Sequence, residues 1–175
     1  MNKKMMYALV SVVVIIVVVG AVVGAYMLMN NGKTTNNVAS ATSLQYNADV
    51  TYQGSTATTV FNWAAKNIGA SDMELRIDIT GGASGNYTYI LNHGTQTAWL
   101  ASNGTWTNVS SDFTNQWNTW VGTGMAWTRN LNALTTNWSG TGDYTYTDSA
   151  TGTTARIYNV AINPTLADSL FQPNT

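Results

Sequence analysis

The chain has 175 residues and a net charge of −1, and only 9% of its residues are charged, against about 25% in an ordinary soluble domain. Nucleic-acid binding needs clustered Lys and Arg, so this composition argues against nucleic acid as a partner. The chain has no Cys, which excludes disulfides, thiolate metal sites, a Cys nucleophile and an acylated Cys anchor.

The first predicted element is a transmembrane helix at residues 5–29, which follows a short segment at residues 1–4. The helix carries no charged residue and exceeds the length of about 20 residues that spans a bilayer. Lys3 and Lys4 precede it, so the positive-inside tendency predicts a cytoplasmic N-terminus and an outer domain on the extracellular side of the cell membrane.

Two other interpretations of this apolar segment stay open. A secretory signal peptide would place its cleavage site at residues 23–25, although signal cores run about 7–15 residues and this segment stays apolar further on. A pilin-like helix would pack in a filament core after processing. Residues 30–42, rich in Asn and Thr, predict a flexible polar spacer, which argues against the pilin-like helix because that helix usually continues into the head.

Residues 43–175 are predicted to form the outer domain, which begins with a series of β-strands. Apolar and polar residues alternate at residues 43–52 and again at residues 72–80, as in half-buried strands. In the second stretch the apolar side chains share one face: Met73, Leu75, Ile77 and Ile79. Composition and turn signals predict further strands at residues 58–68, 86–92 and 95–101, and a short one after the Asn103-Gly104 turn.

A helical insertion is predicted from Ser110 onward. Apolar residues recur there at helical spacing: Phe113, Trp117, Trp120, Val121, Met125, Leu131 and Leu134. Ser110, Ser111 or Asp112 would serve as the N-cap, and Gly122 and Gly124 predict a kink or a break.

The last predicted elements are a hairpin and a short terminal helix. The hairpin pairs residues 143–149 with residues 153–163, and Asn163 and Pro164 are expected to begin the terminal helix as its N-cap and first residue. That helix would carry three apolar side chains: Leu166, Leu170 and Phe171. Together these elements predict an α+β fold, a transmembrane helix followed by a curved antiparallel sheet around a helical insertion.

In the order of its segments the chain resembles the lipoprotein-carrier superfamily, with its LolA-like and LppX-like fold. The resemblance covers about residues 44–171 and rests on the strand at residues 75–79, the Asn92-His93-Gly94 turn before Trp99, and the segment from Asn163-Pro164 to Phe171. It implies an incomplete antiparallel barrel, closed by helices over an apolar cavity that binds acyl chains. The membrane span departs from the family and puts lipoprotein shuttling in doubt. The sparse charge and the Thr- and Asn-rich composition suggest an archaeal cell surface.

The polar residues predict no catalytic, cofactor or metal site, so we do not expect an enzyme. His93, the single histidine, lies in a predicted turn with no partner residues indicated. Asp72, Glu74 and Asp78 alternate along one strand face with Arg76 between them, which is typical of a solvated stripe with weak ion pairs.

Seven Trp residues make the chain rich in aromatic side chains, and the ordinary interpretation is that they fill a core. The functional alternative is an apolar ligand cavity, with sugar stacking as a further possibility. The candidate cavity residues are Trp99, Trp106, Trp117, Trp120, Met125 and Trp127.

Four sequons mark possible N-glycosylation sites, although this many arise by chance in so Asn- and Thr-rich a chain: Asn86, Asn103, Asn108 and Asn137. The sequence thus predicts a single-pass, non-catalytic protein that binds a lipid or other apolar ligand outside the membrane. The alternative is a structural cell-surface subunit, pilin-like or filament-forming.

Overall fold

The computed structural model describes residues 38–81, 85–149 and 151–174. The predicted N-terminal segment, the transmembrane helix and the spacer up to residue 37 therefore lie outside the described residues. Within the described ranges, no helix combines the length and the apolar character needed to cross a bilayer.

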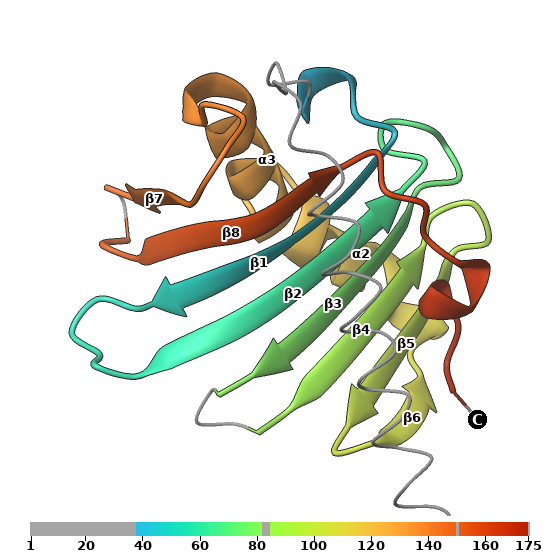
Figure 1. Cartoon of the computed structure of the whole chain (residues 1–175). Coiled ribbons are helices and arrows are strands. Elements are labelled where there is room, and N and C mark those ends of the chain that lie inside the picture. Colours follow the sequence, from blue (N-terminus) through green and yellow to red (C-terminus); the bar gives the residue numbers. More distant parts are fainter. Residues whose placement is uncertain (1–37, 82–84, 150, 175) are drawn as a thin grey trace, which may run out of the picture. The chain divides into compact units, whose positions relative to one another are not determined.

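The described chain forms an α+β domain around an eight-stranded antiparallel sheet (Figure 1). The spatial order is β6-β5-β4-β3-β2-β1-β8-β7. The strands are β1 (Ser43–Thr51), β2 (Thr58–Lys66), β3 (Glu74–Thr80), β4 (Tyr87–Asn92), β5 (Thr97–Ser102), β6 (Thr105–Asn108), β7 (Tyr144–Thr147) and β8 (Thr154–Ile162). Because β6 and β7 lie at opposite edges, the sheet is open. Each strand falls within a few residues of its predicted position, so the predicted antiparallel sheet is confirmed.

The helical insertion connects the two edges of the sheet. Since β6 and β7 are furthest apart, the chain between them has to cross the whole sheet. It does so through η2 (Ser110–Asp112), α2 (Phe113–Val121) and α3 (Ala126–Asn137). The predicted break is confirmed: Gly124 has a φ of 74°, and a Cβ on Gly122 would lie only 2.5 Å from the Asn118 carbonyl oxygen.

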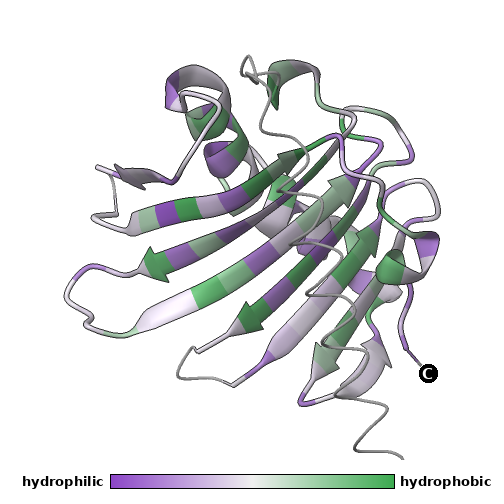
Figure 2. Ribbon diagram, in the orientation of Figure 1, coloured by the Kyte–Doolittle hydropathy of each residue, from purple (hydrophilic) through white to green (hydrophobic). Residues whose placement is uncertain are grey.

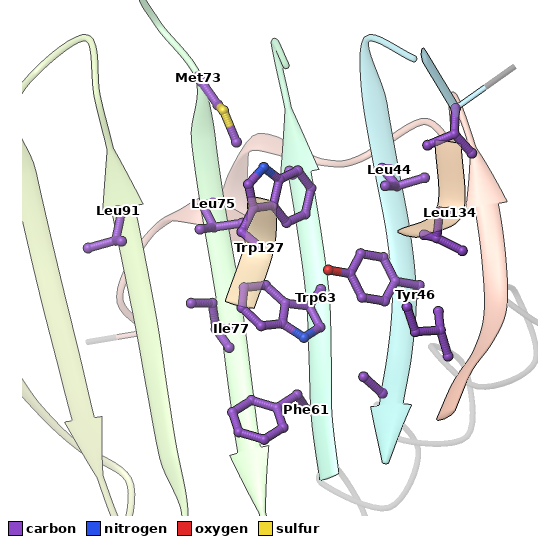
Figure 3. Close-up of a cluster of buried hydrophobic side chains, with 14 of the residues drawn as sticks. Leu44, Tyr46, Phe61, Trp63, Met73, Leu75, Ile77, Leu91, Trp127 and Leu134 are labelled. Atoms are coloured by element: carbon purple, nitrogen blue, oxygen red, sulfur yellow. The ribbon is translucent and has the colours of Figure 1, made fainter. Parts of the chain in front are cut away.

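The hydrophobic core lies between the sheet and this insertion, on what we call the helical face of the sheet. Side chains alternate along each strand between this face and the opposite, outer face, and Figure 2 shows the resulting alternation of hydropathy. Buried residues of the helical face include Leu44, Tyr46, Phe61, Trp63, Leu75, Ile77 and Leu91, which pack against Phe113, Trp127 and Leu134 of the helices (Figure 3).

The N-terminal end of the described chain also belongs to the domain. In η1 (Val38–Ser40), Val38 is buried in the core cluster. The domain therefore extends beyond its predicted start at residue 43.

The C-terminal segment lies on the outer face of the sheet. Phe171 of η3 (Asp168–Phe171) is 4% exposed and packs with Ala64 and Ile90, and four half-buried side chains surround this small cluster: Trp99, Trp106, Leu166 and Leu170. The prediction that Asn163 caps the terminal helix is wrong, because η3 begins only after Ala167. Asn163 instead accepts hydrogen bonds through Oδ1 from the backbone N–H of Thr42, at 2.8 Å, and so ties the end of β8 to the start of β1.

Candidate functional site

Aromatic rings fill the centre of the helical face. Trp63 of β2 is 1% exposed and stacks with Tyr46, with ring centroids 6.0 Å apart. Trp127 of α3 is 2% exposed and lies 6.0 Å from both rings (Figure 3). For these three buried rings, the interpretation that the aromatic residues fill a core is confirmed.

Two indole N–H groups in this cluster are buried without a hydrogen-bond acceptor among the described residues. They belong to Trp63 and Trp120, whose rings are 5.9 Å apart at 75°. Such an edge contact replaces a hydrogen bond only weakly, and a buried donor without a partner costs about 1–3 kcal/mol. Trp138, by contrast, donates its indole N–H to the Gly142 carbonyl oxygen at 2.9 Å.

Some of the aromatic side chains around the indole N–H groups of Trp63 and Trp120 are only half-buried. Trp120 lies 5.0 Å from the ring of Tyr89, and burial raises the pKa of the Tyr89 hydroxyl. The Trp117 ring packs against the His93 ring, with centroids 4.7 Å apart and the two planes tilted by 50°. Met125, at the α2–α3 break, is 37% exposed. We call Tyr89, Trp117, Trp120 and Met125 the aromatic rim.

The sheet divides the six candidate cavity residues between its two faces. Trp117, Trp120 and Trp127 belong to the helical face, and Met125 lies at the helix break. Trp99 and Trp106 pack with Phe171 on the outer face. A single cavity cannot bring all six together, because the sheet lies between the two sets.

A buried polar chain, which the sequence analysis did not single out, crosses the core. The Tyr146 hydroxyl donates to Asn130 Oδ1 at 2.6 Å, and Asn130 Nδ2 donates to the Tyr46 hydroxyl at 3.1 Å. Burial raises the pKa of Tyr46 well above its ordinary value and also raises that of Tyr146. The position of Asn130 in the sequence could have revealed it. Asn130 lies three residues after Trp127 and four before Leu134, which places it on the core-facing side of the predicted helix.

The polar residues considered for catalysis make structural contacts. The Nδ1 atom of His93 lies 2.9 Å from the Ser71 carbonyl oxygen. Within the described ranges, no three acidic or histidine side chains are grouped as a metal would need. Glu74 pairs with Lys66, and Arg76 pairs with Asp78 at 2.9 Å. This stripe contains ion pairs but is not the solvated one expected, because the side chains of Glu74, Arg76 and Asp78 are only 15%, 17% and 31% exposed and the C-terminal segment lies over part of them.

The asparagines of the four sequons are all exposed: Asn86, Asn103, Asn108 and Asn137. The first three lie on β4, β5 and β6 or at the ends of these strands, and the fourth ends α3. Each of these asparagines is therefore open to solvent.

Comparisons of the chain with models of protein families, with curated proteins and with solved structures found no match.

Proposed function

We propose that this chain is a membrane-anchored, extracytoplasmic and non-catalytic binding protein with a LolA-like incomplete barrel. Its ligand is a lipid or another apolar molecule, held between the sheet and the helical insertion beside the aromatic rim. The observation that carries this proposal is the pair of buried indole N–H groups of Trp63 and Trp120 that lack an acceptor.

The two N–H groups define which apolar ligand fits best. A hydrocarbon chain would contact the half-buried rings of Tyr89 and Trp120 but would leave both donors unpaired. A ligand with a carbonyl, ester or hydroxyl oxygen near its apolar part would supply the missing acceptor and recover the cost of the unpaired donors. The arrangement therefore favours an amphiphile, such as an acyl lipid, over a plain hydrocarbon.

The test uses the domain from residue 35 onward, since the chain divides into two units between Thr34 and Thr35 and this start retains the buried Val38. Native mass spectrometry of the purified domain, alone and with a panel of acyl lipids, should reveal a bound lipid. Trp120→Phe keeps an aromatic ring but removes the N–H, so we expect affinity to fall about five- to tenfold.

The matched control is Trp138→Phe, because the Trp138 N–H already has a protein acceptor. This change should lower stability and leave lipid affinity unaltered. A domain that stays empty across the whole lipid panel would refute the ligand proposal while leaving the fold intact.

A further inference from the structure

The outer face of the sheet holds a partly open recess of about 390 Å³, away from the aromatic rim. It lies over β3 to β6, and the side chains that matter to its chemistry are Asp78, Asn86, Thr88, Ala101, Trp106 and Asn174. This volume is at the lower end of the range for small-molecule sites, about 300–1,000 Å³.

The strand register explains the shape of the recess. Asp78 pairs with Thr88, Thr88 with Ala101, and Ala101 with Trp106, so the four side chains form one row across four strands. With about 4.8 Å between neighbouring strands, this row is about 14 Å long. The small Ala101 leaves a hollow between a polar end and an indole ring. Trp106 is supported from the C-terminal segment by the Phe171 cluster.

The polar end of the row is charge-balanced but still has acceptor capacity. Arg76 donates to both carboxylate oxygens of Asp78 at 2.9 Å, and Thr88 donates to Oδ1 at 2.7 Å. A carboxylate has about four acceptor positions, so about one remains, and the Asp78 side chain is 31% exposed. Arg76 also donates to the Leu170 carbonyl oxygen, so its guanidinium group is already engaged by both Asp78 and the C-terminal segment.

This chemistry selects a class of ligand. Phosphates and carboxylates would need an unoccupied cation, and cationic ligands would meet a carboxylate that Arg76 already neutralises. The recess suits a neutral molecule with hydroxyl groups at its edge and an apolar C–H face. A pyranose ring has both features: its hydroxyls would bond Asp78 and Asn86 while its C–H face lies on Trp106.

We propose that this recess is a saccharide-binding site, with Trp106 as its stacking platform. Two sources of saccharide share this chemistry. One is a neutral glycan of the cell surface, and the other is a glycan attached to this chain itself, because Asn86 lies in the recess and begins the sequon Asn86-Tyr87-Thr88. The site does not depend on lipid binding, since it lies on the opposite face of the sheet, but both sources of saccharide rest on the proposed extracytoplasmic location.

The first arm of the test uses the full chain made in a bacterial host without N-glycosylation, kept in a zwitterionic detergent that has no sugar headgroup. Calorimetric titration with neutral oligosaccharides of hexoses and N-acetylhexosamines should detect binding. Ala101→Leu fills the hollow and Trp106→Ala removes the platform, and each should weaken binding about tenfold or more. Thr107→Ala, on the next residue of β6 and the other face of that strand, should leave binding unchanged.

The second arm uses the protein from its native host. If the chain's own glycan fills the recess, glycopeptide mass spectrometry finds Asn86 modified, and Asn86→Gln increases the oxidation rate of Trp106 several-fold. Asn137→Gln, at an exposed sequon on α3, is the matched control and should not change that rate.

Binding in the first arm that is lost with Ala101→Leu supports the cell-surface source, and protection of Trp106 by a glycan on Asn86 supports the attached source. The proposal is overturned if Ala101→Leu and Trp106→Ala bind as the unmodified sequence does. It is also overturned if no oligosaccharide binds and Asn86→Gln leaves the oxidation of Trp106 unaltered.

Discussion

Asn130 joins three elements of the core through one side chain. It is 4% exposed on α3 and bonds Tyr46 of β1 and Tyr146 of β7. Asn130→Ala leaves both hydroxyls without this partner, so we expect the free energy of unfolding to fall by about 2–3 kcal/mol. Urea denaturation followed by circular dichroism measures this loss. Asn132→Ala, on the exposed side of the same helix, is the control and should change stability by less than about 0.5 kcal/mol.

The structural role of an individual asparagine could not be predicted from the sequence. Asn-Pro is a common helix start, and the Asn163 prediction followed that rule. The structure uses Asn163 differently: its φ is +54°, a left-handed conformation that Asn tolerates better than most residues. Asn103 and Asn159 adopt similar angles. Which asparagine caps a helix and which turns the backbone depends on tertiary partners that a local pattern does not contain, here the N–H groups of Thr42 and Ser43 at the start of β1.

Among the elements, η3 makes the most specific prediction. It is held to the outer face by burial of Phe171, by the Lys66 ammonium group 4.9 Å above its ring, and by the bond from Arg76 to the Leu170 carbonyl oxygen. Phe171→Ala should lower stability by about 3 kcal/mol and make the C-terminal segment susceptible to carboxypeptidase.

The control for this change is Asp168→Asn in the same segment. Lys66 lowers the pKa of the Asp168 carboxyl, but the Asp168 side chain is 86% exposed. Loss of this surface pair should leave both the melting temperature and the digestion rate nearly unchanged. Equal sensitivity of the two variants would mean that the ion pair holds the segment as strongly as burial of the ring does, which contradicts the prediction.

Periodicity predicted the strands and the helix break because each is a local property of the chain. Met73, Leu75 and Ile77 alternate with charged residues, and all three are buried on the helical face. The side of the sheet on which the terminal segment lies was not predictable in the same way. Leu170 and Phe171 indicate only that this segment has an apolar surface to bury, and it could bury that surface against either face of the sheet.

For the whole molecule, the hairpins determine the order of the strands in the sheet, but they do not determine which residues form the candidate site. Six successive strands form a meander, and β8 returns to the free side of β1. The six candidate cavity residues were grouped by composition, whereas the strand register places Trp106 opposite Ala101 on the outer face, and the packing of α3 places Trp127 against the helical face. Composition gives the number of aromatic rings, but strand register and helix packing assign them to a face.

The predicted membrane anchor at residues 5–29 determines where the whole molecule is expected to be found. We expect the full chain to stay in the membrane fraction after carbonate extraction, because an uncharged segment of this length is stable in a bilayer. N-terminal sequencing of the native protein should then read from residue 1 or 2. A start just before the apolar segment would favour the pilin-like alternative, and a start after residue 25 would identify a cleaved signal peptide.

Buried tyrosines predict how the stability of the whole domain depends on pH. Burial raises the pKa of Tyr46, Tyr89, Tyr146 and Tyr158 above the ordinary value of about 10. A raised folded-state pKa means that the folded state retains protons that the unfolded state loses. The stabilisation is therefore complete below about pH 10 and is lost as the pH rises through the folded-state values.

Above about pH 10 we expect the free energy of unfolding to fall by up to about 1.4 kcal/mol per pH unit for the fully buried Tyr46, and by less for Tyr146, Tyr89 and Tyr158, whose hydroxyls are partly screened by solvent. Urea titrations at increasing pH measure this slope, and tyrosinate absorbance should appear together with the loss of the circular dichroism signal. Tyr46→Phe lowers stability at neutral pH, because Asn130 loses its acceptor, but it makes the alkaline slope shallower. Tyrosinate formation by all of these residues in a domain that remains folded would contradict the prediction, because it requires the buried hydroxyls to ionise without a conformational cost.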